Sequence, residues 1–300
     1  MKLSTRSFCF VATAVCLLAA FASAQPARER VSFNSDWRFQ KDDPVEAKGV
    51  LSYQNISDWV RSTGNDFVLT SNAVKSARPP GNLGENFVYT RTEFNDSTWR
   101  KLDLPHDWAI EGDFVQDLPG ETGKRPFAGV GWYRKHFQVS PSDKGKRIYI
   151  DFDGAMAYPT IWLNGQFVGG WTYGYSSFRL DLTPYIKFGG ENVIAVRLEN
   201  LPESSRWYPG SGIYRNVWLV KTEPIHVAHW GTYITTPEVG AGAATVKVAT
   251  TVQNDSASNA NVTVRTRVYE LSANRIRRTK PVVSGENSRQ IGRASCRERV

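Results

Sequence analysis

The stretch TIWLNGQFVG, Thr160 to Gly169, holds the clearest local structural signal in this sequence. Two alternating, largely apolar runs flank Asn164-Gly165. An Asn-Gly pair between such runs is typical of a β-hairpin, because both residues accept the positive φ angles of a type I′ turn. We therefore predict two antiparallel strands joined by a two-residue turn at Asn164 and Gly165.

Short runs with strand character lie on both sides of this hairpin. They are rich in β-branched and aromatic residues, and Gly, Pro, Asn and Asp separate them. The runs cover residues 30–40, 131–139, 147–152, 178–186, 192–199 and 213–220. Residues 178–186 are expected to form a strand that continues into one short helical turn. About eight strands at this spacing predict an all-β fold, an antiparallel jelly-roll or β-sandwich.

Two segments of this region depart from the strand pattern. Lys41 to Glu85 is a polar insertion with Pro79-Pro80-Gly81, and we assign it no secondary structure. Phe94 to Trp99, FNDSTW, is expected to form a turn with Trp99 tucked beneath it. The role of the insertion stays open at this level.

A second domain is predicted after the polar break Lys221-Thr222-Glu223-Pro224. Three further strands are expected at 225–234, 244–252 and 262–269. An immunoglobulin-like sandwich needs about seven strands, so we expect this domain to be incomplete. Ile291 to Val300, IGRASCRERV, follows a polar stretch without strand signal and is expected to be non-native or disordered.

The N-terminus has the pattern of a signal peptide. Lys2 and Arg6 precede an apolar run at 8–21, and Ala22-Ser23-Ala24 is a small-residue cleavage site. We therefore expect export to the periplasm or the extracellular space, with no membrane association after cleavage. The predicted organisation is a signal peptide at 1–24, a jelly-roll at 25–222, an incomplete immunoglobulin-like sandwich at 223–290 and a tail at 291–300.

Cysteine and histidine usage argues against a metal site or a disulfide. Cleavage removes Cys9 and Cys16 and leaves Cys296 alone. His226 and His229 are three residues apart on a predicted strand and would face opposite sides of the sheet. No cofactor is evident from the sequence.

Net charge gives no indication of nucleic-acid binding. The formal charge is +8, and the N-terminal Lys2 and Arg6 together with the last ten residues account for half of it. The remaining positive charge is spread without a basic cluster that could release counterions from a nucleic acid.

The first candidate site lies in Ser205 to Val220, SRWYPGSGIYRNVWLV. Its turn-rich first half places Arg206, Trp207 and Tyr208 on a loop, and aromatic and Arg side chains can stack on sugar rings and bind hydroxyl groups. The alternative is that Trp207 and Tyr208 cap the end of a sandwich core. From the residues alone the two readings are balanced.

The second candidate site is His106-Asp107-Trp108, which follows Leu104-Pro105 at the point where a strand ends. A carboxylate beside a Trp can accept hydrogen bonds from sugar hydroxyl groups while the ring stacks on the sugar. The alternative is that Asp107 caps its own turn and Trp108 packs under it, and it is at least as well supported.

A paired-carboxylate site is a weaker candidate. Asp151 and Asp153 share one face of the predicted 147–152 strand and its end, at a spacing compatible with glycosidase carboxylates. The alternative is a solvated sandwich face with Ile150 and Phe152 turned inward. Two carboxylates without a surrounding cleft favour this alternative.

Several long motifs of this chain resemble the N-terminal sugar-binding domain of family 2 glycoside hydrolases, especially the β-galactosidase branch. Their order and spacing match the family over roughly residues 31–222. The motifs are FNDSTWRKLDLPHDW at 94–108, GVGWYRKHF at 129–137, IWLNGQFVGGWTYGYSSFRLDLTPYI at 161–186 and SRWYPGSGIYRNVWLV at 205–220. The segment from Glu223 is similar to the family's immunoglobulin-like second domain.

The resemblance implies a domain order of jelly-roll, immunoglobulin-like sandwich and (β/α)₈ barrel. The barrel of such enzymes supplies the acid/base and nucleophile glutamates of a retaining mechanism. None of the carboxylates of this chain matches either catalytic motif, so we assign no catalytic residue. The loops that match those reaching the barrel's sugar subsite carry His106, Asp107, Trp108, Arg206, Trp207 and Tyr208.

The expected function is therefore that of an N-terminal fragment of an exported β-galactosidase-type glycosidase, inactive without its barrel. Its partners would be a β-galactoside and the missing barrel, with oligomer formation by the full-length enzyme left open. Two alternatives remain: a stand-alone carbohydrate-binding module, and a parent enzyme with β-glucuronidase or β-mannosidase specificity.

Overall fold

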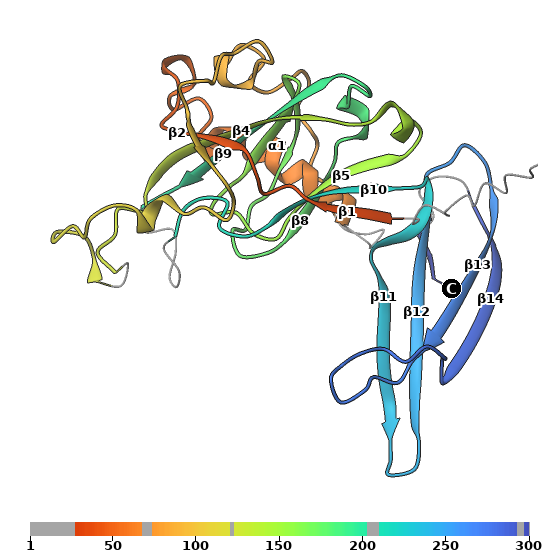
Figure 1. Cartoon of the computed structure of the whole chain (residues 1–300). Helices are drawn as coiled ribbons and strands as arrows, with labels where there is room; N and C mark the ends of the chain where they lie inside the picture. Colours follow the sequence, from red (N-terminus) through yellow and green to blue (C-terminus); the bar gives the residue numbers. More distant parts are fainter. Residues whose placement is uncertain (1–27, 68–73, 121–122, 203–209, 293–296, 300) are drawn as a thin grey trace, which may run out of the picture.

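A two-layer β-sandwich forms the first part of the chain (Figure 1). The computed structural model describes residues 28–67, 74–120, 123–202, 210–292 and 297–299. A six-stranded antiparallel sheet has the order β3-β2-β4-β9-β6-β7, and a four-stranded antiparallel sheet has the order β1-β10-β5-β8. This two-sheet arrangement confirms the all-β prediction.

The sandwich contains the first ten strands of the described chain, with the 41–85 insertion between the second and the third. They are β1 (Arg28–Ser32), β2 (Trp37–Lys41), β3 (Arg100–Leu102), β4 (Gly129–Gln138), β5 (Arg147–Phe152), β6 (Thr160–Leu163), β7 (Gln166–Gly170), β8 (Phe178–Asp181), β9 (Glu191–Asn200) and β10 (Val217–Thr222). Short 3-10 helices lie at Val45–Ala47, Gly64–Phe67, Val88–Thr90, Trp108–Ile110, Pro141–Asp143 and Thr183–Tyr185. The last of these is the helical turn predicted after β8.

The predicted hairpin is confirmed in its turn and in its register. Leu163 of β6 pairs with Gln166 of β7, so the loop holds two residues only. Asn164 has φ 53° and Gly165 has φ 79°, the positive values that a type I′ turn requires.

The main hydrophobic core fills the space between the two sheets. Alternate residues of facing strands point inward, and Trp37, Tyr133 and Phe152 are among the largest side chains that are fully buried there. Phe152 stacks on Phe178 with ring centroids 4.9 Å apart. Burial of such aromatic rings supplies much of the free energy that holds the sheets together.

A second hydrophobic cluster covers the outer face of the six-stranded sheet, and the 41–85 insertion builds it. The insertion contains an α-helix, α1 (Tyr53–Thr63), although the sequence analysis assigned this segment no structure. Ile56 and Val60 are buried in one cluster with Trp132 and Trp162 of the sheet. The spacing of Ile56 and Val60 is the helical signal that the polar residues around them masked.

An ion pair ties the insertion to the sheet. The Arg197 guanidinium of β9 makes two hydrogen bonds of 2.7 Å to the Asp43 carboxylate, and the indole of Trp132 donates to the same carboxylate at 2.9 Å. Both charged side chains are buried.

The turn predicted around Trp99 is also confirmed. The Asn95 carboxamide oxygen accepts a hydrogen bond from Ser97 N–H at 3.0 Å, and Trp99 is buried.

The second domain consists of two sheets, and its long strands extend away from the sandwich (Figure 1). Its strands are β11 (Ile225–Val239), β12 (Ala244–Asn254), β13 (Ala260–Val268), β14 (Val283–Ile291) and β15 (Arg297–Arg299). The orders are β11-β12-β15 and β13-β14. The three predicted strands are present, each longer than or shifted slightly from its expected range.

Strand β14 is a correction, because the sequence analysis found no strand signal there. Its sequence VSGENSRQI lacks alternation and is exposed except at Ile291. Pairing with β13 decides its structure: the two strands align over nine residue pairs, and Thr263–Ser288 and Arg265–Glu286 side-chain contacts lie across them. Arg297–Arg299 pairs with β12, so the 291–300 segment is not wholly irregular; its non-native origin stays a prediction.

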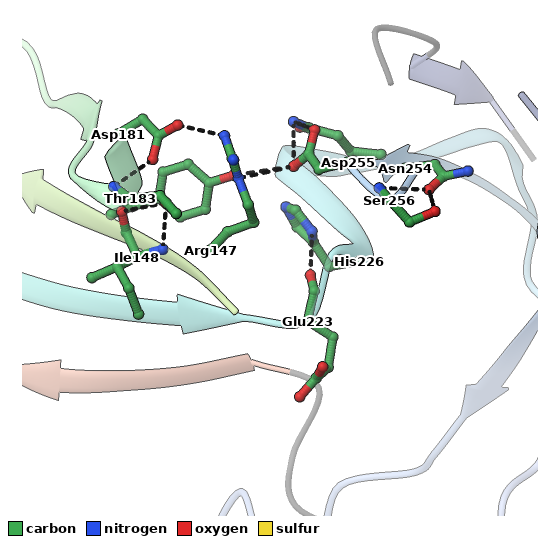
Figure 2. A network of polar contacts seen from close by, with 11 residues as sticks. Arg147, Ile148, Asp181, Thr183, Glu223, His226, Asn254, Asp255 and Ser256 are labelled. Atoms are coloured by element: carbon green, nitrogen blue, oxygen red, sulfur yellow. Dashed lines mark hydrogen bonds and ion pairs between the residues drawn. The ribbon is translucent and has the colours of Figure 1, made fainter. Parts of the chain in front are cut away.

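The two domains meet in a network of polar contacts (Figure 2). Arg147 of β5 forms ion pairs with Asp181 at 2.5 Å and with Asp255, beyond β12, at 3.5 Å. Asp255 also accepts a hydrogen bond from Tyr149 at 3.4 Å. His226 of β11 contacts the Glu223 carbonyl oxygen at 2.8 Å. The two contacts with Asp255 bridge the predicted boundary.

The signal peptide predicted at 1–24 lies outside the described residues. Within the described residues, no helix is long and apolar enough to cross a membrane.

Candidate functional site

The candidate site is built where two loops far apart in the sequence lie side by side. His106 N–H donates to the Ile213 carbonyl and Trp108 N–H to the Ser211 carbonyl, both at 2.9 Å. Gly212 exchanges hydrogen bonds of 2.9 and 3.0 Å with Met156. The predicted 106–108 segment is thus paired directly with 211–213, which closely follow the predicted 206–208 loop.

Asp107 fixes this pairing through its side chain. Its Oδ1 accepts hydrogen bonds from Ala109 N–H and Ser211 N–H, each at 2.8 Å. Asp107 is the N-cap of the 3-10 helix Trp108–Ile110 and is buried. These contacts match the alternative in which Asp107 caps its own turn. They also add a link that was not predicted, the hydrogen bond to Ser211 in the second loop.

Ser211 lies at the centre of a buried polar cluster. Its hydroxyl donates to the Phe127 carbonyl at 2.5 Å and accepts from the Asn200 carboxamide at 2.7 Å. Asn200 also donates to the Gly210 carbonyl at 3.0 Å. A cluster with this many satisfied groups holds the loop backbone in one geometry.

Gly212 is required by the close approach of the two loops. Its φ of 133° is unfavourable for other residues, and a Cβ there would lie 2.3 Å from the His106 carbonyl oxygen. The second glycine of the GSG motif is thus explained by packing against residues 106–108.

A chain of side-chain contacts runs from the core to the surface at this end of the sandwich. His106 Nδ1 lies 2.6 Å from the Tyr133 hydroxyl, and His106 Nε2 lies 3.2 Å from Glu111 Oε1. Glu111 accepts two hydrogen bonds from Arg100, at 2.7 and 2.8 Å. The sequence analysis missed Tyr133, Glu111 and Arg100, since no local pattern brings them to His106.

The protonation states of this chain follow from burial and charge. Burial lowers the pKa of His106, an effect that the Glu111 carboxylate opposes in part. The Arg100 hydrogen bonds lower the pKa of Glu111 despite some burial. Burial raises the pKa of Tyr133 well above its usual range. At neutral pH the site therefore holds a neutral imidazole beside an ionised Glu111–Arg100 pair.

Trp108 is part of the core wall beneath the site. It is buried, its ring stacks on Phe39 at 5.8 Å, and its indole N–H donates to the Phe127 carbonyl at 3.2 Å. Gly131 makes room for it, because a Cβ on Gly131 would lie 2.4 Å from the Trp108 ring. This is the packed arrangement set out as the alternative to sugar stacking.

Three predicted site residues, Arg206, Trp207 and Tyr208, lie outside the described residues, and their sugar-binding role stays a prediction. The same holds for the sugar-binding role of His106, Asp107 and Trp108, whose position is now known. The weaker candidate pair, Asp151 and Asp153, is engaged in other contacts. Asp151 is buried and accepts two hydrogen bonds from the Arg179 guanidinium, at 2.6 and 2.8 Å. Asp153 accepts a hydrogen bond from the Trp218 indole at 3.0 Å.

The region around this site matches a known family. Residues 119–224 match the model described as "Glycosyl hydrolases family 2, sugar binding domain". "Beta-galactosidase BoGH2A" of Bacteroides ovatus is 41% identical over 266 residues, which cover 88% of this chain and 26% of that protein. A solved family 2 member from Bacteroides cellulosilyticus is 32% identical with a TM-score of 0.65, covering 87% of this chain and 28% of that one.

This chain belongs to glycosyl hydrolase family 2.

The family 2 relatives carry more than one activity in their names. A "Beta-glucuronidase" of Formosa agariphila is 29% identical over 269 residues, covering 81% of this chain and 23% of that protein. The chain spans about a quarter of the length of each of these two curated relatives. Residues 211–213 lie inside the region that matches the sugar-binding domain, and residues 106–108 precede that region in the sequence.

Proposed function

We propose that this chain is the N-terminal part of an exported family 2 β-galactosidase that hydrolyses terminal β-galactosides with retention of configuration. The observation that carries the proposal is the 41% identity to a protein named a β-galactosidase, extending over 88% of the chain. The catalytic acid/base and nucleophile glutamates are proposed to lie in a barrel domain outside these 300 residues.

The sandwich would contribute to the sugar subsite from its paired loops. Asp107 and the backbone hydrogen bonds beside it hold residues 106–108 against residues 211–213, which closely follow the 206–208 segment. Arg206, Trp207 and Tyr208 would contact the galactoside, with Asp107 and His106 behind them. Pre-positioned donors and rings lower the entropic cost of binding the sugar.

A β-glucuronidase is the second candidate, because a relative that covers 81% of the chain carries that name. A glucuronidase must bind a sugar carboxylate, for which an Arg is the usual partner. Arg206 in the candidate loop would be such a residue.

Two measurements test the proposal. The 300-residue chain, incubated with 4-nitrophenyl β-galactoside, should release no nitrophenol; turnover proportional to purified chain would contradict the assignment of catalysis to a barrel. A longer gene product that includes the barrel should hydrolyse the galactoside faster than 4-nitrophenyl β-glucuronide, and NMR should show the β-anomer of galactose first. The opposite preference would favour the glucuronidase.

A further inference from the structure

A group of tyrosines lies near the paired loops and takes no part in the site described above. Tyr173 and Tyr175 come from the loop between β7 and β8, and Tyr214 precedes β10. We call these three residues the tyrosine patch. The rings of Tyr173 and Tyr175 are 5.5 Å apart at 61°, and the Tyr214 hydroxyl donates to the Gly174 carbonyl at 3.1 Å.

The loop that carries the patch is held rigidly. The Trp171 indole donates to the Ser176 hydroxyl at 2.8 Å, and that hydroxyl contacts the Tyr173 carbonyl at 3.4 Å. The Trp171 ring also stacks on Phe178 of the core at 5.8 Å and 10°. Gly174 allows close packing, since a Cβ there would lie 2.5 Å from Met156 Sδ. A side chain on such a support loses little entropy when it binds a ligand.

Tyr173 is nevertheless 60% exposed. Its ring therefore adds apolar surface at a fixed position facing solvent, where a rigid aromatic ring can pack on a ligand. Arg215 is exposed beside the patch: a Cβ on Gly154 would touch both Arg215 Cδ at 2.8 Å and Tyr214 Oη at 2.9 Å. An aromatic ring with a guanidinium and hydroxyl groups nearby suits a pyranose, which has an apolar C–H face and a rim of hydroxyls.

The patch and the paired loops share one support. Met156 contacts Gly174 on one side and exchanges backbone hydrogen bonds with Gly212 on the other. Gly212 in turn contacts His106. The patch thus lies at the same end of the sandwich as the proposed sugar subsite, and within the matched sugar-binding region.

We propose that the tyrosine patch binds a sugar unit of an oligosaccharide further along the chain from the residue that is cleaved, with Tyr173 as the stacking platform. This proposal rests on the proposed function for the class of sugar. Its ligand is a β-linked oligosaccharide and not a monosaccharide. A single sugar unit could occupy either the proposed sugar subsite or the tyrosine patch, but not both.

Ligand-observed NMR titrations test the proposal. They measure how β-1,4-galactotetraose and galactose bind to the 300-residue chain. Tyr173→Ala should weaken tetraose binding about tenfold, while Tyr173→Trp should keep it, since stacking needs an aromatic ring and not the hydroxyl. Galactose binding should change little. Tyr233→Ala is the matched control, because Tyr233 is 64% exposed and lies on β11 of the second domain.

Each other outcome decides the proposal. Unchanged tetraose binding by Tyr173→Ala overturns the patch and leaves the proposed function standing. The proposal is also overturned if the wild-type chain binds neither galactotetraose nor a β-1,4-glucuronan oligosaccharide. It is likewise overturned if light scattering shows a Tyr173-dependent dimer and no saccharide binds. Tyr173-dependent binding of the glucuronan oligosaccharide alone supports the patch and contradicts the galactoside specificity.

Discussion

The Asp107 carboxylate accepts a hydrogen bond from the backbone N–H of Ser211 at 2.8 Å, across 104 residues of sequence. The same oxygen accepts from Ala109 N–H. One buried side chain therefore caps the start of the Trp108–Ile110 3-10 helix and also fixes the position of a distant loop. It connects residues 106–108 to residues that closely follow the 206–208 segment, and both segments are proposed, not shown, to contribute to a sugar subsite.

Replacing Asp107 by Ala should destabilise the first domain by about 1–3 kcal/mol, because two buried N–H groups lose their acceptor. Asp107→Asn should cost less, since its carboxamide oxygen can still accept. Urea denaturation followed by tryptophan fluorescence measures both. Asp113→Asn, at an exposed position nearby, is the control. Equal stability of the Ala variant and wild type would show that the cap contributes nothing.

Gly212→Ala should be among the most damaging single substitutions in the chain. The new Cβ would meet the His106 carbonyl at 2.3 Å, and φ of 133° is unfavourable for Ala. We expect a loss of several kcal/mol or insoluble protein. Gly242→Ala, where no atom lies within 4 Å of the added Cβ, should stay within about 0.5 kcal/mol of wild type in the same thermal melt. Comparable melting of the two variants would contradict the proposed close approach.

Stability should fall as the pH drops from 7 toward 5. Burial lowers the pKa of His106 and of His226, so below the unfolded value of about 6.5 the unfolded chain binds more protons than the folded one. The stabilisation is complete above that pH and is lost on acidification. Urea midpoints measured at several pH values should show a smaller slope in His106→Asn and in His226→Asn. An unchanged slope in both would exclude these imidazoles as the cause.

Asp43→Ala should cost about 3 kcal/mol, because the buried Arg197 guanidinium loses both of its 2.7 Å hydrogen bonds to that carboxylate and keeps the longer 3.4 Å contact with the Glu199 carboxylate. Asp58→Ala removes an exposed partner of Arg61 in the same insertion and should change stability by less than about 1 kcal/mol. Guanidinium denaturation of these two variants would show whether the insertion is part of the folded unit. Similar small losses of unfolding free energy in both variants would show that the insertion contributes little to the stability of the sandwich.

The prediction from sequence succeeded where structure is set by neighbours in the chain. Asn164-Gly165 favours its turn locally, since these two residue types tolerate the positive φ angles that the turn requires. It failed for α1 and β14, which depend on distant partners: α1 is stabilised by Trp132 and Trp162, and β14 by backbone pairing with β13.

The amino-acid sequence by itself determined the family motifs, the 160–169 hairpin and most strands of the first sandwich, because alternation and turn chemistry act over a few residues. Only the tertiary structure decided that Asp107 pairs with Ser211, that Trp108 is buried and that Tyr173 stands exposed on a rigid loop. Contacts between residues about 100 positions apart depend on how the two sheets pack, and no local pattern encodes that packing.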